Sequence, residues 1–322
     1  MNQLIRVSQF SLARCIVCCI GISALLTSPT LAQVDGPFDT IINLPGDETI
    51  ITGADFEFIG GAVGETTQLN VSDGGTVGNG FDARVGSEVN VDGGTVGARF
   101  AAAAGSEVNI LSGSVGGSFQ AQGDSQVNIS GGNVGDSLES NAGSEVNISG
   151  GNLSDIVARG SVDISGGTVD SVLQILSGGE VTISGGSVDD ISGRAGSQLN
   201  LVGRNFSIDN EELENLTPGE ASIINDRDVT ISGFLADGQP FSYELGTTFS
   251  LFGFFSTNAT LTVTPIVILG DVNQDGMVAF SDISPFISLL SSGGFQTEAD
   301  INQDNVVSFA DISPFIGILS GS

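Results

Sequence analysis

One short phrase of alternating apolar and polar residues recurs along much of the chain. In GSEVNISGGN (143–152), a valine and an isoleucine flank an asparagine, and a glycine pair follows. Alternation of this kind is the period of a β-strand with one buried face. Alignment on the asparagine gives eight equivalent positions at steps of 16 to 20 residues: Asn70, Asn90, Asn109, Asn128, Asn147, Asp163, Thr182 and Asn200.

Two further apolar positions complete each unit. A single Val or Leu follows the glycines, at Val77, Val96, Val115, Val134, Leu153, Val169 and Val188. A third apolar site comes four residues later, at Phe81, Phe100, Phe119, Leu138, Val157 and Leu173. Three short strands with glycine corners predict a mainly β fold, a parallel β-solenoid of about 19 residues per coil. Stacking is expected because one coil alone cannot bury its apolar face, whereas stacked coils form a continuous core. The variable step favours a right-handed coil.

The polar positions form columns along the predicted solenoid. The asparagines fit an amide ladder between successive coils. A second column is predicted to be a solvated face, with weak calcium binding as the alternative, at Glu88, Glu107, Gln126, Glu145, Ser161, Glu180 and Gln198. A loose arginine column (Arg84, Arg99, Arg159, Arg194) near Asp155 and Asp189–Asp190 is where an enzyme cleft would lie. We favour solvated charges there and assign no catalytic residue.

The composition limits the partners of the chain. There is no His or Trp, and 38 acidic residues stand against 8 basic ones, which gives a formal net charge of −30. Such a chain repels nucleic acid and anionic lipid. Its 40% of hydrophobic residues argues against a disordered acidic tail.

The N-terminus has the pattern of a signal peptide. Arg6 and Arg14 precede the apolar run CIVCCIGISALL (15–26). Small residues before position 33 predict cleavage after Ala32. The run is too short for a membrane span, so the mature chain is expected to have none and to be extracellular or at the cell surface. All three cysteines, Cys15, Cys18 and Cys19, lie in this segment, so the mature chain has no disulfide.

Changes in pattern divide the chain. Residues 1–32 are the predicted signal peptide, and 33–64 are predicted to cap the N-terminal coil. The solenoid is predicted over 65–204. A β-rich stretch (205–265) is predicted to cap the other end, because terminal repeats must cover an open coil. Residues 266–322 form a separate tail.

The tail carries the strongest chemical signal. DVNQDGMVAFSD (271–282) and DINQDNVVSFAD (300–311) are 12-residue loops with oxygen side chains at positions 1, 3, 5 and 12 and a carbonyl at position 7. That pattern suits Ca²⁺, which prefers six to eight oxygen ligands. The predicted ligands of two calcium ions are Asp271, Asn273, Asp275, Met277 and Asp282, then Asp300, Asn302, Asp304, Val306 and Asp311. Gly276 supplies the turn at position 6, where the second loop has Asn305, a residue that tolerates a left-handed conformation.

Each loop leads into a predicted helix with one apolar stripe. The stripes are Ile283, Phe286, Ile287 and Leu290, then Ile312, Phe315, Ile316 and Leu319. The tail resembles a type I dockerin, a module of two EF-hand-like loop–helix repeats with Asp at position 12. The resemblance covers about the last 55 residues. It implies calcium-dependent folding and docking onto a cohesin-like or other cell-surface protein through Phe280, Ser281, Phe309 and Ala310.

Together these patterns predict a secreted or cell-surface, non-catalytic structural or adhesive β-solenoid, docked to a partner by a calcium-binding, dockerin-like tail. The alternative is a dockerin-bearing carbohydrate-active enzyme of the β-helix class, either a polysaccharide lyase or a glycoside hydrolase. A third hypothesis is a module that binds polysaccharide on one flat side of the solenoid.

Overall fold

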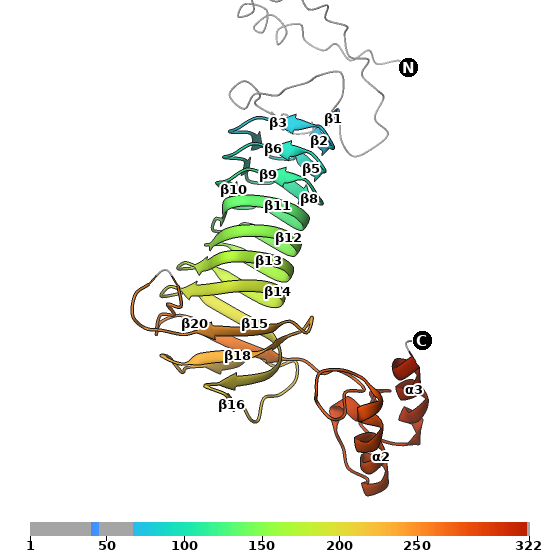
Figure 1. Cartoon of the computed structure of the whole chain (residues 1–322). Coiled ribbons are helices and arrows are strands. Elements are labelled where there is room, and N and C mark those ends of the chain that lie inside the picture. Colours follow the sequence, from blue (N-terminus) through green and yellow to red (C-terminus); the bar gives the residue numbers. More distant parts are fainter. Residues whose placement is uncertain (1–39, 45–66, 251, 321–322) are drawn as a thin grey trace, which may run out of the picture. The chain divides into compact units, whose positions relative to one another are not determined.

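The computed structural model describes residues 40–44, 67–250 and 252–320. The predicted signal peptide and most of the predicted N-terminal cap therefore lie outside the described residues. In the described part the chain is mainly β, with a parallel β-solenoid of about seven turns and two short C-terminal helices (Figure 1). None of the helices in that part is long and apolar enough to cross a membrane.

The first three coils each contain three short strands, as the repeat predicts. They are β2 (Thr67–Ser72), β3 (Thr76–Val77), β4 (Asp82–Ala83), β5 (Glu88–Asp92), β6 (Thr95–Val96), β7 (Ala101–Ala102), β8 (Glu107–Ile110), β9 (Ser114–Val115) and β10 (Phe119–Ala121). Each strand pairs in parallel with its equivalent in the next coil, as β2 does with β5 and β5 with β8. The sheet on each side therefore runs along the solenoid.

The next four coils are nearly continuous strands that bend at the corners. These are β11 (Gln126–Ser140), β12 (Glu145–Ala158), β13 (Ser161–Ile175) and β14 (Glu180–Gly193). Their pairing shifts register at the glycine corners, for example between Ile129 and Asn133. Gly132 has φ +77° there, and a Cβ on it would crowd the carbonyl of Gly113 in the preceding coil. Glycine is thus required both by the backbone angle and by the coil spacing.

The predicted alignment of the coils is confirmed by the strand pairing. All eight aligned positions, from Asn70 to Asn200, face one another in successive coils. One predicted core position is wrong. Ile156, not Val157, occupies the column of Leu138 and Leu173 and is fully buried, while Val157 pairs with Glu139 on the outer side. The coil that begins at Glu145 is shorter than the coil before it. The corner that precedes Ile156 has one residue fewer than the equivalent corner before Leu138.

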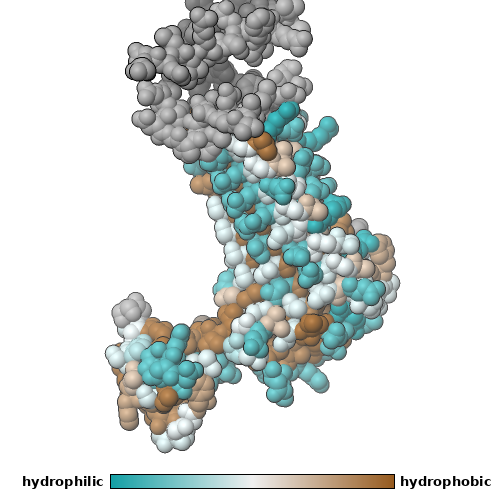
Figure 2. Space-filling model, turned by 180° about the vertical axis from the view of Figure 1, so that it is seen from behind, coloured by the Kyte–Doolittle hydropathy of each residue, from teal (hydrophilic) through white to brown (hydrophobic). Residues whose placement is uncertain are grey.

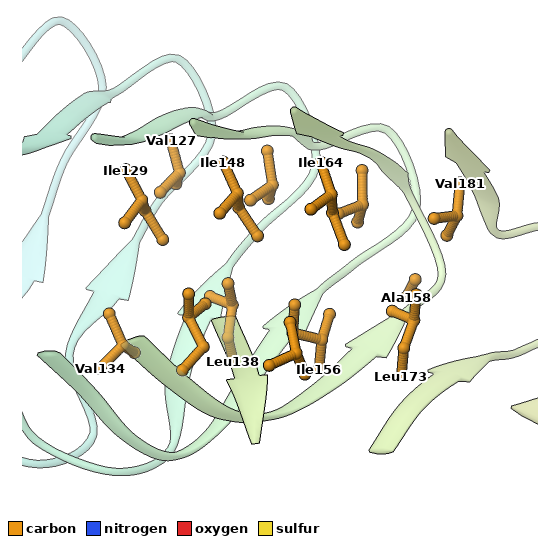
Figure 3. Packing of buried hydrophobic residues seen from close by; sticks show 14 of the residues in the cluster. Val127, Ile129, Val134, Leu138, Ile148, Ile156, Ala158, Ile164, Leu173 and Val181 are labelled. Atoms are coloured by element: carbon orange, nitrogen blue, oxygen red, sulfur yellow. The ribbon is translucent and has the colours of Figure 1, made fainter. Parts of the chain in front are cut away.

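Apolar side chains fill the interior of the solenoid from all three sides. Figure 3 shows Val127, Ile129 and Ile148 pointing inward from one side towards Leu138 and Ile156 on another. Three rings stack in the first coils, with centroids 5.4 Å apart for Phe81 and Phe100 and 4.7 Å apart for Phe100 and Phe119. Like residues lie over like residues, so one repeated phrase makes a continuous core.

Strands from both predicted cap regions extend the solenoid. β1 (Thr40–Leu44) pairs in parallel with β2, so the region predicted as an N-terminal cap supplies a rung. At the other end β15 (Gln198–Ile208) pairs in parallel with β20 (Thr260–Pro265). Antiparallel strands then cover this end: β16 (Glu211–Glu212), β17 (Ser222–Ile224), β18 (Thr230–Leu235) and β19 (Pro240–Glu244).

The tail has a small core of its own. It contains α2 (Ile283–Ser292) and α3 (Ile312–Ser320), each preceded by a short 3-10 turn, η1 (Phe280–Asp282) and η3 (Phe309–Asp311); η2 (Thr297–Ala299) lies between them. Phe286 and Phe315 meet with ring centroids 4.4 Å apart. The predicted apolar stripes lie only partly in this core, because Ile287 and Ile316 are 56% and 58% exposed. The helices meet along the phenylalanines, and Leu289 packs against this core instead.

Candidate metal-binding loops

The first aspartate of each tail loop is buried and holds the turn that follows it. Asp271 accepts hydrogen bonds from the backbone N–H of Asp275 (3.0 Å) and of Gly276 (2.8 Å). In the second loop Asp300 accepts from Asp304 (3.0 Å) and Asn305 (2.7 Å). Position 1 therefore has the same backbone partners in both loops, and each loop is curled around its first carboxylate.

The last aspartate of each loop is buried and ties the loop to its helix. Asp282 accepts from the N–H of Asn273 (2.9 Å) and of Ala279 (2.8 Å). Asp311 accepts from Asn302 (3.1 Å) and Ser308 (2.8 Å) in the same way. Because position 12 bonds to position 3, the two ends of each loop are held together, as a single cation between them requires.

Positions 3 and 5 are exposed and bonded to each other. The Asn273 amide donates to Asp275 (2.8 Å), and the Asn302 amide donates to Asp304 (3.0 Å). Their side chains also accept backbone N–H groups within the loop, for example from Met277 to Asp275 at 3.1 Å. These bonds hold the position 3 and 5 side chains in one local turn.

Position 6 is left-handed in both loops, as predicted. Gly276 has φ +93° and Asn305 has φ +66°. Asn is one of the few residues with a side chain that adopt this conformation at modest cost. The replacement of glycine by asparagine therefore preserves the turn of the second loop.

The first loop concentrates negative charge. Burial raises the pKa of Asp271, and the carboxylates of Asp282 and Asp275 raise it further, while the hydrogen bond from Gly276 opposes them. The pKa of Asp275 is lowered, chiefly by the hydrogen bond from the Asn273 amide. Residues 266–322 contain no Arg or Lys. A bound cation would offset a mutual repulsion that no basic side chain of the tail relieves.

The donor set fits a hard cation better than a soft one. Carboxylate, amide and carbonyl oxygens suit Ca²⁺ or Mg²⁺, whereas Zn²⁺ prefers nitrogen and sulfur ligands. Within the described ranges, however, no group of three or more His, Cys, Asp or Glu side chains is arranged so that it could hold a metal ion. The exposed Asp275 and Asp304, now bonded to neighbouring amides, would have to turn towards the buried aspartates.

The tail also exposes many apolar side chains. Phe280 and Phe309, predicted to face a partner, are 80% and 83% exposed, and their neighbours Ser281 and Ala310 are exposed as well. Two further pairs of exposed apolar residues are equivalent in the two repeats, Met277 with Val306 and Ile287 with Ile316, while Phe295 and Ile318 are exposed without an exposed equivalent. Figure 2 shows brown, hydrophobic surface on the tail. The helical period placed Ile287 and Ile316 on the apolar stripes but did not show that both are exposed.

Three of the four arginines of the predicted column follow equivalent strand positions but are several coils apart, and the fourth lies at another corner. Arg84 and Arg159 follow equivalent strand positions four coils apart, about 19 Å at the usual strand spacing. Arg194 lies two coils beyond Arg159, and Arg99 stands at a different corner, before Phe100. Arg159 pairs with Glu139 (3.6 Å). The predicted loose column is therefore spread along the solenoid.

The other two polar columns are formed as predicted. Asn amides donate coil to coil, from Asn90 to Asn70 (3.0 Å), from Asn109 to Asn90 (3.0 Å), and on to Asn147. In the second column three glutamines and a serine interrupt the glutamates, although Glu88 and Glu107 remain neighbours. Two of the glutamines donate to a glutamate, Gln68 to Glu88 (2.8 Å) and Gln198 to Glu180 (3.0 Å). These bonds reduce the repulsion of stacked carboxylates.

Comparison of the chain with protein-family models, with curated proteins and with solved structures finds no match.

Proposed function

We propose that this protein is an exported, non-catalytic structural or adhesive protein. Its β-solenoid serves as a rigid spacer or adhesive surface, and its tail binds two calcium ions and docks the solenoid to a partner. The observation that carries the proposal is the equivalence of the two tail loops. Both bury their first and last aspartates, and both expose the same set of apolar side chains beside them.

The proposed ligands are the oxygen-bearing groups at the same five positions of each loop. In the first loop these are Asp271, Asn273, Asp275 and Asp282, with the carbonyl of Met277; in the second they are Asp300, Asn302, Asp304 and Asp311, with the carbonyl of Val306. When bound, calcium supplies positive charge that offsets the carboxylate repulsion. Because the tail core is small, its folding free energy is expected to depend on the ions.

The proposed partner is a cohesin-like or other cell-surface protein. Phe280 and Phe309 offer rings that only a partner would bury, and Ser281 and Ala310 beside them leave room for its approach. Hot spots of protein interfaces are typically well-packed aromatic side chains of this kind. The enzyme alternative gains no support from the arginines, because they are distributed over several coils and two corners.

Titration calorimetry of the full chain with Ca²⁺ tests the metal. We expect two bound ions and a gain of helix in far-ultraviolet circular dichroism, because α2 and α3 follow the loops directly. Asp271→Ala combined with Asp300→Ala is expected to remove both. The matched control is Asp82→Ala combined with Glu220→Ala, which removes two exposed acids elsewhere. Equal calcium binding by the two double variants would refute the assignment.

The docking step is tested separately by a pull-down from the surface of the parent cells. The partner is expected to be captured in Ca²⁺, to be released by a chelator, and to be lost with Phe280→Ser combined with Phe309→Ser. Capture that depends on neither calcium nor the two phenylalanines would contradict docking through the tail.

A further inference from the structure

One arginine of the solenoid contacts the first loop of the tail. Arg204, in β15, donates a hydrogen bond from Nη2 to the carbonyl of Gly276 (3.1 Å), the residue at position 6 of that loop. Its Cζ lies 5.3 Å from the ring centre of Phe234, which flanks the guanidinium. The connection from the end of β20 to the first loop covers only residues 266–270, so the loop begins close to the strand that carries this arginine.

The charge of Arg204 is not taken up by an ion pair. Within the described ranges no carboxylate is close enough to pair with its guanidinium, and its Nε is buried without a hydrogen-bond partner. A partly buried charge is screened less than a charge in open water. The positive field of Arg204 therefore acts on the first loop, where its hydrogen bond places it.

The residue at position 6 decides which loop can accept this contact. A Cβ on Gly276 would lie 2.7 Å from Nε and 2.8 Å from Cζ of Arg204, so a side chain at this position would displace the guanidinium. The second loop has Asn305 here, with the same left-handed backbone (φ +66°). An arginine could not lie across Asn305 in the same way. The two loops share their hydrogen bonds but differ in their electrostatic surroundings.

We propose that Arg204 lowers the calcium affinity of the first loop and leaves that of the second loop unchanged. The inference rests on the proposed binding of calcium by the tail. Gly276 lies between the proposed ligands Asp275 and Met277, so the guanidinium is beside the site that the ion would enter, and the two positive charges repel.

The coupling between the ion and the arginine is reciprocal. An ion in the first loop weakens the contact of Arg204 with Gly276 by the same factor by which Arg204 weakens the binding of the ion. The last coil of the solenoid thus sets how much calcium the tail needs to fill both loops, and the tail alone would not show this requirement.

The test is a calcium titration of the full chain, followed in each loop separately by nuclear magnetic resonance. The backbone N–H of Gly276 and that of Asn305 each donate to the first aspartate of their own loop, at 2.8 Å and 2.7 Å, so each amide signal reports one loop. Arg204→Gln keeps a donor but removes the charge. We expect it to lower the calcium midpoint of Gly276 about three- to tenfold and to leave that of Asn305 unchanged.

Two further variants separate the charge of Arg204 from other effects. Arg204→Lys keeps the charge and is expected to titrate as the native chain does. Arg159→Gln is the matched control, because it removes an equal charge from an earlier coil, and it should leave both midpoints unchanged at an ionic strength of about 0.1 M. Circular dichroism checks that all three variants keep the β fold.

Three results would overturn the inference. The first is an unchanged midpoint of Gly276 in Arg204→Gln. The second is an equal shift at Asn305, or the same shift in Arg159→Gln, because net charge alone would then be the cause. Both of these results leave calcium binding by the tail intact. The third is the absence of any calcium response at either amide, which refutes the proposed function of the tail together with this inference.

Discussion

Asp163→Asn is expected to stabilise the solenoid by repairing its amide ladder. The ladder runs with one polarity, because each Asn amide donates to the Oδ1 of the preceding coil, from Asn70 to Asn43 (2.8 Å) up to Asn147 to Asn128 (3.1 Å). Asp163 is the next residue in the column. A carboxylate cannot donate, so the Oδ1 of Asn147 faces a second acceptor, and an asparagine at 163 would supply the missing N–H.

The size of the effect follows from one hydrogen bond at a partly exposed site. Such a bond contributes about 0.5–1.5 kcal/mol, and we expect about 0.5–1 kcal/mol here because water competes for the partners. For a chain of this size that is a rise in Tm of about 1–4 °C. The reverse change, Asn128→Asp, removes the donor to Asn109 (2.9 Å) and places two acceptors together. It should cost about 1–2 kcal/mol.

Thermal unfolding followed by circular dichroism measures both variants, with hydrogen exchange at residues 160–166 as a local readout. The control is Asp82→Asn, which removes the same charge from an exposed position outside the ladder. Charge relief alone would raise Tm equally in Asp82→Asn and Asp163→Asn. A gain for Asp163→Asn no larger than that of the control, or a neutral Asn128→Asp, would refute the ladder as a source of stability.

The stacked core and the glycine corners make two further predictions. Phe100→Ala removes the middle ring of the buried stack and should cost about 3–5 kcal/mol, whereas Phe280→Ala at an exposed site should cost less than about 0.5 kcal/mol in chemical denaturation; similar losses would contradict the packing. Gly113→Ala and Gly178→Ala both strain a positive φ, but only the first collides with the Gly94 carbonyl. Gly113→Ala should therefore lower Tm more, and an equal drop in Tm would show that coil spacing does not demand glycine there.

The repeat in the sequence was sufficient to predict the solenoid and its register. The aligned asparagines pair as expected because identical residues one coil apart can share both the amide bonds outside and the core inside. The turns of the two tail loops could also be predicted from the sequence. Their turns depend on contacts within 12 residues, and the left-handed Asn305 and the buried Asp311 lie where local spacing puts them.

Contacts between distant segments decided the rest. Ile156 rather than Val157 is buried because the register with the neighbouring coils places Ile156 between Leu138 and Leu173. Ile287 is exposed because the two helices meet along the face that carries Phe286. The periodicity of one helix cannot show which part of its apolar stripe will contact the other helix.

The sequence by itself thus determined the β-solenoid and the two loops of the tail, because these depend on residues that are close in sequence or that recur once in every repeat. Only the tertiary structure decided the pairing of β20 with β15. It also decided the position of the loop between β19 and β20, where the N–H of Gly253 donates to Asp190 of β14. Both arise from segments that share no repeat, and only packing at an otherwise open end of the solenoid selects their positions.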